Sequence, residues 1–311
     1  KAEVILDRFD EAREMDADIY HFHDPFLMPF AAKLQEPDTA VVYDCHEVYS
    51  TKLQWYDFPP DLLNPLVDRF YNAVEAHYAT EYDATVAVTE WMHARFIDSG
   101  YAAPHLVRNF PILGQIDADV GFIDRPHEFM LVYVGGISEP RGIAQMLAAI
   151  AGARSAGIDA GLWLIGAADG AATELIEDHH DHSSVHHLGR LPYADVFPYL
   201  AAADVGLALL DPRMYGRGIP TKLFEYMASG IPVIASETRA NRAYVDAAYG
   251  FVVPYEDTRA TVNAISMLAE ESDTLDRMGA AGRAAVEDRY SWEQEQSRLL
   301  DLYDHICDSI A

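Results

Sequence analysis

A lysine and a glutamate stand three residues apart at the start of a predicted helix, in the run GRGIPTKLFEYMASGIPVIAS (216–236). A helix start carries positive partial charge, so Lys222 is badly placed there unless an anion lies beside it. A surface pair with Glu225 is the simple alternative, but lysine before glutamate is the poorer order against the helix dipole. We therefore predict a phosphate held by Lys222 and by backbone amides near Pro220 and Thr221. Glu225, one turn further on, could accept hydrogen bonds from two ribose hydroxyls.

Helical spacing divides this segment into two faces. The predicted polar face carries both signs of charge and consists of Lys222, Glu225, Tyr226 and Ser229. The predicted core-facing side consists of Leu223, Phe224, Met227 and Ala228.

A second phosphate-binding loop is predicted in YVGGISEPRGI (133–143). Gly135 and Gly136 would end a strand and let a phosphate approach the backbone, and Arg141 could clamp phosphate oxygens just before a helix. Two glycines between a strand and a helix are also ordinary in βα units, so this loop alone leaves phosphate binding open. Together, the two helix starts indicate a site for a nucleoside diphosphate.

Histidines and carboxylates follow two predicted strands of the first half, in YHFHDP (20–25) and YDCHEVY (43–49). Ligands of open α/β sheets bind where the carboxyl ends of the strands lie. The side chains placed at this edge are His21, His23, Asp24, Asp44, His46 and Glu47. The possible metal ligands among them are His23, Asp24, His46 and Glu47. Tight ligand spacing such as HExxH is absent, so we expect hydrogen bonds to a polyhydroxylated ligand and no metal.

A histidine-rich run, HHDHSSVHH (179–187), lies in an acidic and serine-rich setting. Its composition predicts a solvated loop rather than a metal site. The histidines concerned are His179, His180, His182, His186 and His187.

Composition and missing motifs exclude several classes of function. The 311 residues include 50 acidic and only 22 basic ones, which favours solubility in high salt and leaves no basic stripe for nucleic acid. Two distant cysteines offer no disulfide framework, and no apolar run is long enough to span a bilayer. The chain lacks a GxSxG elbow, a Walker loop and a dinucleotide-binding GxGxxG pattern, so hydrolases, ATPases and dehydrogenases are not favoured. We expect a cytoplasmic protein, and its location could include the inner face of the membrane.

The elements that must position these residues alternate between short strands and helices. In the second half, FMLVYVGG, GLWLIG, ADVGLALL and IPVIAS read as strands separated by helices, which predicts a parallel, doubly wound α/β domain. In the first half, the predicted strands are 18–23, 40–44, 85–89 and 105–107, so this Rossmann-like domain appears without the opening strands that are usual.

The predicted domain order follows from this alternation. An incomplete N-terminal domain covers 1–115, a linker covers 116–127 and a C-terminal Rossmann-like domain covers 128–290. A helix over 291–311 ends the sequence.

These runs, and above all PTKLFEYMASGIPVIAS, resemble the nucleotide-sugar-dependent glycosyltransferases of the GT-B fold, of the retaining family 4 type. The likeness also runs through DADIYHFHDPFLMP, VVYDCHEVY, LVYVGGISEPRGI, HHLGRLPYADVF and GFVVP, and so covers nearly the whole chain. It implies two Rossmann-like domains facing across a cleft, with the nucleotide-sugar donor held mainly by the second domain and the acceptor by the first, where the acceptor-side candidates are His23, Asp24, His46 and Glu47. It also implies that the final helix, over 291–311, packs back on the first domain.

The resemblance also implies roles for matched residues. Lys222 and Arg141 would bind the pyrophosphate above Gly135 and Gly136, and Glu225 would bind the ribose. The backbone at Gly189, Arg190 and Leu191 would meet the base. His46 would reach the transferred sugar or the acceptor, so that His46, Arg141 and Lys222 form the catalytic set.

The chain departs from the family pattern at three places. Arg217 stands eight residues before Glu225, where many relatives have a second glutamate; it could contact phosphate or be a surface arginine. Gly136 and Arg141 replace the arginine and the lysine that are usual in the first glycine loop, and the family's first strands are not in this sequence.

The expected activity is transfer of a sugar, with retention, from a nucleotide diphosphate sugar to a glycan, lipid-linked or small acceptor, without a metal or other cofactor. Peripheral association with a membrane would suit a lipid-linked acceptor. Two alternatives stay open. One is a non-hydrolysing nucleotide-sugar epimerase of the same fold, with Asp24 and Glu47 as acid and base. The other is a non-catalytic subunit that resembles a glycosyltransferase.

Overall fold

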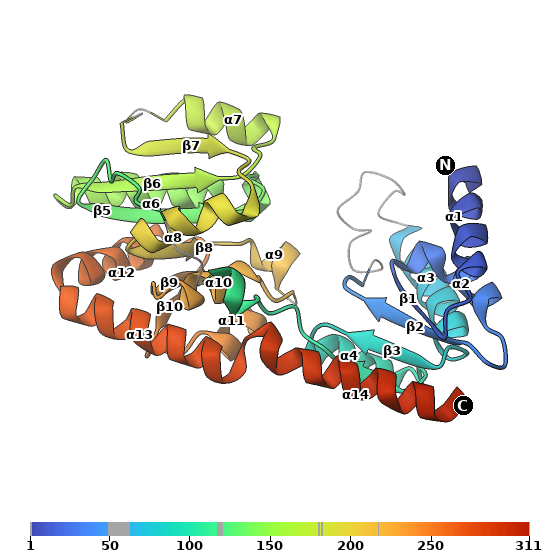
Figure 1. Cartoon of the computed structure of the whole chain (residues 1–311). Coiled ribbons are helices and arrows are strands. Elements are labelled where there is room, and N and C mark those ends of the chain that lie inside the picture. The colour runs from blue at the N-terminus through green and yellow to red at the C-terminus, as the bar shows by residue number, and fades with distance from the viewer. Residues whose placement is uncertain are drawn as a thin grey trace. The chain divides into compact units, whose positions relative to one another are not determined.

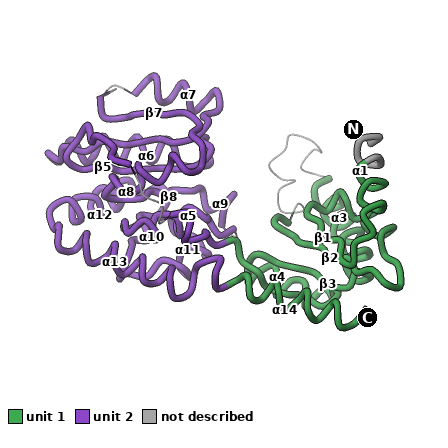
Figure 2. The backbone as a smooth tube through the Cα atoms, viewed as in Figure 1, with its two compact units in different colours: residues 1–109, 295–311 green, residues 110–294 purple. Residues whose placement is uncertain are grey.

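The structure is a computed structural model that describes residues 2–48, 63–116, 121–179, 181, 183–216 and 218–310. The chain forms two compact units (Figure 2). Unit 1 consists of residues 1–109 and 295–311, and unit 2 consists of residues 110–294. Unit 2 thus includes residues 110–115, which the sequence analysis assigns to the first domain, and the predicted linker 116–127.

Unit 1 is built on a sheet that has four parallel strands among the described residues, in the order β1-β2-β3-β4. Its strands are β1 (Ile19–His23), β2 (Ala40–Cys45), β3 (Ala84–Ala87) and β4 (Pro104–Leu106). Its helices are α1 (Ala2–Glu14), α2 (Met28–Ala31), α3 (Asn64–Ala79), α4 (Glu90–Asp98) and most of α14 (Trp292–Ile310), with 3-10 turns η1 (Pro25–Leu27) and η2 (Ala32–Leu34) (Figure 1). Every residue of β2 and β3 is buried, as expected for parallel strands covered on both faces.

A buried ion pair fixes two helices of unit 1 to each other. Glu75 of α3 is 1% exposed and forms a salt bridge of 2.5 Å with Arg95 of α4. The hydroxyls of Tyr101 and Tyr43 also donate to Glu75, over 2.9 and 3.2 Å. A buried carboxylate is tolerated when its oxygens are satisfied in this way. The pair therefore fixes the helices that follow β2 and β3.

Unit 2 contains a sheet of six described parallel strands in the order β10-β9-β8-β5-β6-β7. The strands are β5 (Phe129–Val134), β6 (Ala160–Ile165), β7 (Val185–Gly189), β8 (Val205–Ala208), β9 (Val233–Ser236) and β10 (Gly250–Val253). The strand order reverses between β5 and β8, which gives a doubly wound sheet with a topological switch point there. The predicted class of α/β fold with two Rossmann-like sheets is confirmed.

Helices cover both faces of this sheet (Figure 1). They are α5 (Leu113–Ile116), α6 (Ile143–Ser155), α7 (Gly170–Glu177), α8 (Phe197–Ala202), α9 (Pro212–Tyr215), α10 (Lys222–Ala228), α11 (Arg239–Tyr244), α12 (Thr258–Glu270) and α13 (Ser272–Arg289), with 3-10 turns η6 (Glu139–Arg141) and η7 (Tyr193–Val196). Several starts are fixed by side-chain caps that bond an otherwise unpaired backbone N–H, for example Thr238 at α11 and Asp257 at α12.

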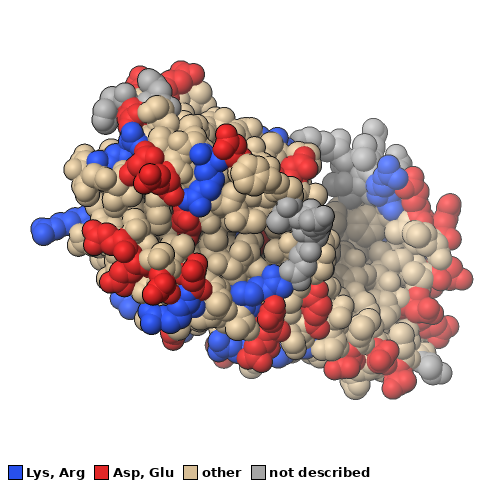
Figure 3. All heavy atoms as spheres, turned by 60° about the vertical axis from the view of Figure 1, so that its left-hand side comes forward, with Lys and Arg blue, Asp and Glu red and all other residues tan. Residues whose placement is uncertain are grey.

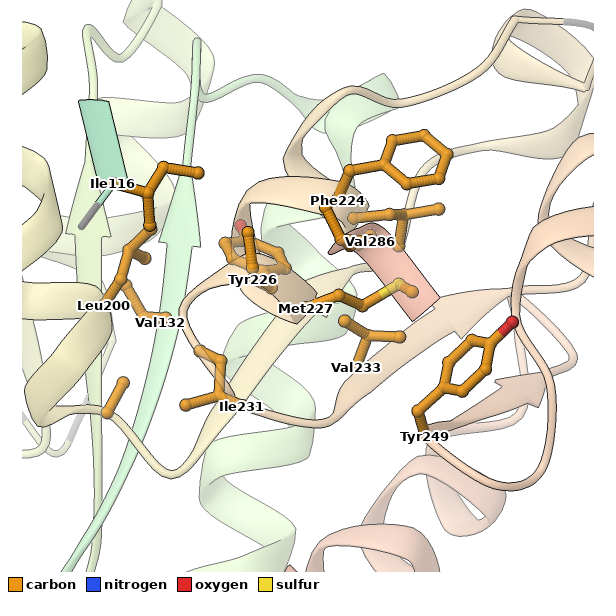
Figure 4. Packing of buried hydrophobic residues seen from close by; sticks show 14 of the residues in the cluster. Ile116, Val132, Leu200, Phe224, Tyr226, Met227, Ile231, Val233, Tyr249 and Val286 are labelled. Carbon is orange, nitrogen blue, oxygen red and sulfur yellow. The ribbon is translucent and has the colours of Figure 1, made fainter. Parts of the chain in front are cut away.

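Helix α10, which carries the lysine and glutamate of the opening motif, lies deep in the core of unit 2. Phe224 and Met227 of α10 pack in one cluster with Val286 of α13 (Figure 4). The predicted core-facing residues of this helix are all buried. The prediction that Tyr226 belongs to a polar face is wrong, because this side chain is 0% exposed.

Tyr226 is buried because the sheet has room for its ring and partners for its hydroxyl. A Cβ on Gly206 of β8 would lie 2.2 Å from the Tyr226 ring, so glycine makes space for it. The hydroxyl accepts a hydrogen bond from the backbone N–H of Val134 (2.9 Å) and donates to the carbonyl of Leu207 (3.3 Å). It therefore links α10 to β5 and β8.

The segment that the sequence predicts as a linker packs, where it is described, against unit 2. Ile116 is buried in the same cluster as α10, and Ile123 packs against that cluster. Aliphatic side chains in this segment thus contribute to the core.

The histidine-rich run is not a solvated loop throughout. His186 and His187 lie in β7, which pairs with β6, and His179 is 8% exposed. His180 and His182 lie outside the described residues. Edge strand β7 is only partly buried and contains polar side chains. A search for runs of apolar residues therefore does not identify it as a strand.

No helix among the described residues is both apolar enough and long enough to cross a bilayer. On the face drawn in Figure 3, acidic side chains occur in many small groups, with basic ones among them.

Candidate functional site

The two predicted phosphate-binding segments of unit 2 meet at the switch point of its sheet. Gly135 and Gly136 follow the carboxyl end of β5, and Lys222 opens α10, which follows β8 in the chain. From β5 the chain continues to β6 and β7 on one side of the sheet, and from β8 it continues to β9 and β10 on the other side. The loops that follow these two neighbouring strands therefore diverge and leave room for a ligand.

Lys222 is buried beside the first glycine loop. Lys222 is 8% exposed, and its Nζ donates a hydrogen bond to the hydroxyl of Tyr133 over 3.0 Å. The same Nζ lies 4.1 Å from the centroid of the Tyr133 ring. A Cβ on Gly135 would lie 3.1 Å from Nζ and 3.5 Å from Nη1 of Arg141. The two cations therefore flank Gly135.

This position excludes the simple alternative of an exposed lysine paired with glutamate on the surface. Among the described contacts of Lys222, the partner of its ammonium is the Tyr133 hydroxyl, and Glu225 acts on it only through its charge. Burial, and then the nearby charge of Arg141, lowers the pKa of Lys222 to about 7, against a small opposing effect of Glu225. An anion beside Lys222 and Arg141 would relieve this electrostatic cost.

Arg141 is held in place by an aromatic side chain and by the turn that follows it. Its Nε donates to the Tyr215 hydroxyl over 3.1 Å, and its guanidinium lies 5.6 Å from the centroid of that ring. Gly142, the next residue, has φ 84°, and a Cβ there would lie 1.8 Å from the carbonyl oxygen of Leu209. Only glycine fits this turn, which aims Arg141 back at Gly135 and Gly136.

Glu225, the predicted ribose ligand, is half-buried, and one of its oxygens accepts a hydrogen bond of 3.2 Å from the hydroxyl of Tyr193. Burial raises the pKa of Glu225, although the hydrogen bond from Tyr193 and the charge of Lys222 act against this. The sequence prediction missed Tyr193. Its position two residues after Leu191, which was predicted to meet the base, is the signal that could have found it.

The other predicted donor residues of unit 2 lie at the end of β7 and just after it, or just before α10. Gly189 ends β7 with φ 68°, and its carbonyl accepts from the N–H of Gly166 over 2.8 Å. Arg190 is exposed and Leu191 is partly buried. Pro220 and Thr221 precede a helix of seven residues, so Lys222 itself is the stronger anion-binding feature here. Arg217 lies outside the described residues.

In unit 1, His21 and His23 of β1 and His46, just after β2, gather around one carboxylate, that of Asp44 in β2. Oδ2 of Asp44 lies 3.2 Å from Nε2 of His21, 3.3 Å from Nδ1 of His23 and 3.3 Å from Nε2 of His46. Parallel pairing places His23 directly beside Asp44, which explains why the two segments meet. The sequence places all of these residues at one edge, but it does not identify Asp44 as the centre.

The remaining acceptor-side candidates take other positions. Asp24 has φ 85° and caps η1, where its side chain accepts a hydrogen bond from the N–H of Phe26. Glu47 is exposed, and its carbonyl accepts a hydrogen bond from the Cys45 thiol.

The electrostatic surroundings in this cluster shift the pKa values of His46 and His23 in opposite directions. Burial acts to raise the pKa of Asp44, but hydrogen bonds from His21 and His46 outweigh it and lower the value to about 2. The hydrogen bond with Asp44 raises the pKa of His46, whereas burial lowers the pKa of His23. Asp44 is therefore ionised at any moderate pH.

Two family models match the chain. The model of the glycosyl transferases group 1 matches residues 128–271, and that of the glycosyl transferase 4-like domain matches residues 3–109. These matches cover most of both units, and the chain belongs to this family of GT-B glycosyltransferases.

Two relatives are similar in sequence over part of the chain. A phosphatidyl-myo-inositol mannosyltransferase of Mycobacterium leprae is 29% identical over 68% of this chain, and a GDP-mannose-dependent phosphatidylinositol monomannoside mannosyltransferase of Corynebacterium glutamicum is 35% identical over 38%. The match spans 52% of the first relative and 32% of the second.

Solved structures with the same fold include the sucrose-phosphate synthase of Thermosynechococcus elongatus, with a TM-score of 0.78 and 19% identity over 98% of this chain and 78% of that one. Anabaena HepE, solved in complex with UDP, has a TM-score of 0.76 and 15% identity over 97% of this chain and 82% of that one. At these identities the likeness concerns the fold.

Proposed function

We propose that this protein transfers a glycosyl group, with retention at the anomeric carbon, from a nucleoside diphosphate sugar to a hydroxyl of a lipid-linked or glycan acceptor. The observation that carries the proposal is the buried ammonium of Lys222, which lies beside Gly135 together with the Arg141 guanidinium. A diphosphate is the ligand chemistry that suits two cations over a glycine loop at a switch point.

The proposed chemistry needs charge stabilisation more than a protein nucleophile. The bond from C1 of the donor to its diphosphate oxygen breaks as the bond from C1 to the acceptor oxygen forms, and the acceptor hydroxyl gives its proton to the departing diphosphate. Negative charge grows on the diphosphate during this step. Lys222 and Arg141 would stabilise that charge, and they are already in place before the substrate arrives.

The rest of the donor would lie on groups next to these cations. Glu225 would accept hydrogen bonds from the ribose, which requires its present hydrogen bond with Tyr193 to be shared or exchanged. The backbone from Gly189 to Leu191 would meet the base. In unit 1, His46 would meet the transferred sugar or the acceptor, with its ring oriented by Asp44 and Asn109.

The names of the relatives suggest where a substrate search should begin. Both bacterial relatives are named as mannosyltransferases of phosphatidylinositol compounds, and one is named as GDP-mannose-dependent. GDP-mannose and a phosphatidylinositol acceptor are therefore the first pair to test. A lipid-linked acceptor would bring the protein to a membrane surface.

The test is release of nucleoside diphosphate from a panel of GDP-, UDP- and dTDP-sugars, with and without acceptor. We expect release from one donor that requires an acceptor, and a product whose anomeric configuration by NMR matches the donor. Conversion of a donor to its epimer without acceptor would support the epimerase instead. If no donor binds by calorimetry, the non-catalytic subunit becomes the better explanation.

A further inference from the structure

The histidine cluster of unit 1 is bonded in an uneven way. Three imidazole nitrogens, from His21, His23 and His46, approach the same oxygen of Asp44 within 3.2 to 3.3 Å. A carboxylate oxygen has two lone pairs, so it accepts about two good hydrogen bonds. The other oxygen, Oδ1, is buried and has no hydrogen-bond partner among the described residues. Hydrogen bonds alone therefore leave one imidazole too many on Oδ2 and none on Oδ1.

The contacts around His46 identify which histidine serves as the donor to Asp44. The amide nitrogen of Asn109 lies 2.8 Å from Nδ1 of His46, so Nδ1 accepts and Nε2 carries the hydrogen that it donates to Asp44. His46 thus orients the carboxylate and has no free lone pair for a metal ion.

His21 and His23 can each present a lone pair. Nδ1 of His21 lies 2.7 Å from the Tyr303 hydroxyl. When the ring hydrogen is on Nδ1, that hydroxyl accepts it, and Nε2 presents a lone pair in place of its hydrogen bond to Asp44. A metal-ligating histidine usually donates its other ring N–H in this manner. The facing atoms of His21, His23 and Asp44 all lie within 4.8 Å of one another.

We propose that His21, His23 and Asp44 form a binding site for a divalent transition-metal ion such as Zn²⁺, with Nε2, Nδ1 and a carboxylate oxygen as ligands. Tetrahedral Zn²⁺ with bonds of about 2.0–2.1 Å holds neighbouring ligand atoms about 3.3 Å apart. The distances from Oδ2 of Asp44 to His21 and His23 have this length. Two imidazoles and one carboxylate also favour Zn²⁺, Co²⁺ or Ni²⁺ over Mg²⁺ and Ca²⁺.

In the proposed site, two of the ligands are held in place by burial and the third is accessible to solvent. Asp44 and His21 are mostly buried, with side-chain exposures of 12% and 15%, while His23 is 58% exposed and would face an ion arriving from solvent. Three protein ligands leave a further coordination position open, which is typical of sites that bind a substrate oxygen. This inference differs from the sequence-based expectation of no metal, and it does not depend on the proposed glycosyl transfer.

The experiment is metal titration of the chelator-treated full chain. We expect one equivalent of Zn²⁺ to bind by calorimetry, and Co²⁺ to give the strong visible bands of a tetrahedral site that Zn²⁺ then removes. His23→Gln should weaken Zn²⁺ binding at least about tenfold, since loss of even a hydrogen-bond partner of a metal ligand typically costs about 10- to 100-fold in affinity. The exposed position of His23 makes this variant a safe one for folding, which circular dichroism would check.

The matched control is His77→Gln. His77 is also an exposed histidine next to a carboxylate, with 3.7 Å from its Nδ1 to Oε1 of Glu81, but this pair lies on the surface at the end of α3. Zn²⁺ affinity should not change in this variant. The proposal is overturned if the chain binds no Zn²⁺, if His23→Gln and His77→Gln bind equally well, or if Asp44→Asn, when folded, keeps the full affinity.

Discussion

The burial of Lys222 is costly for the folded protein. Its pKa falls from an ordinary value of 10.5 to about 7, mainly because of burial, and one pKa unit corresponds to about 1.4 kcal/mol. An ion-pair partner for its ammonium is not found among the described residues, where Tyr133 supplies a hydroxyl and a ring face. A cost on the order of a few kcal/mol is expected of a residue that is kept for binding.

The first prediction concerns nucleotide affinity. Lys222→Met should weaken binding of UDP or GDP by at least about tenfold, because a charged hydrogen bond is worth about 1.5–3 kcal/mol. In the unchanged protein, affinity should fall as pH rises from 7 to 9, by up to about tenfold per unit, since the ligand-free lysine loses its proton above a pKa of about 7. Calorimetry at several pH values measures both. Equal affinity in the variant, or no pH dependence above 7, would contradict the phosphate assignment.

Lys222→Met, which should weaken nucleotide binding, should raise the stability of the folded protein at pH 7. Between pH 7 and about 10 the unfolded chain binds one more proton at Lys222 than the folded chain, so the free energy of unfolding rises with pH in this window. Lys222→Met should therefore be more stable than the unchanged protein at pH 7, and this gain should shrink toward pH 10. Lys33→Met, which changes an exposed lysine, is the control and should have little effect. A loss of stability in Lys222→Met at pH 7 would argue against a burial cost.

At the scale of elements, the strand ends of unit 2 are shaped by glycines that bring backbone segments together. Gly142 joins η6 to α6, and Gly166 after β6 lies so close to Gly135 that a Cβ on it would be 1.9 Å from the Gly135 carbonyl oxygen. Such close approach sets where the loop after β5 lies, and hence where Arg141 is held.

Gly142→Ala tests this arrangement. The added methyl group would lie 1.8 Å from the Leu209 carbonyl oxygen, so the backbone must shift, and both stability and nucleotide affinity should fall. Gly157→Ala is a matched control, because Gly157 also has a positive φ (91°) but open space around it. The control should lose only about 1–2 kcal/mol of unfolding free energy. If urea denaturation gave the two variants equal losses, the close contact at Gly142 would not matter.

At the scale of the whole molecule, the net charge of −28 is the dominant feature. Like charges repel one another in the compact state, and salt screens this repulsion as the Debye length falls from about 10 Å at 0.1 M to about 3 Å at 1 M. The surface in Figure 3, with acidic groups spread over the visible face, fits a general effect of this kind.

We therefore expect the melting temperature to rise steadily between 0.1 and about 2 M potassium chloride, as followed by circular dichroism. Chloride is used because sulfate would also strengthen burial of apolar groups. A variant with several surface glutamates changed to glutamine should melt higher at low salt and gain less from added salt. A melting temperature that stays constant or falls would contradict the proposed adaptation to high salt.

The sequence by itself determined many of the regular elements. Strands such as 40–44 and helices such as α6 follow from periodicity, because apolar spacing and chain breaks are local properties. The glycine loop, Arg141, Lys222 and Glu225 could likewise be selected, since their types and spacing fit one kind of ligand. Strand β7 was missed because an edge strand needs less apolar surface, and so its histidines resembled a loop.

Only the tertiary structure decided which of these side chains meet and which are buried. Helical spacing alone left Lys222 on a surface, whereas packing of α10 between the sheet and α13 buried it beside Tyr133. The hydrogen bond from Tyr193 to Glu225 joins residues from different elements. The same is true of Asp44, which lies at the centre of three histidines. Such contacts depend on strand order, register and close packing, which arise from interactions far apart in the chain and leave no local pattern to read.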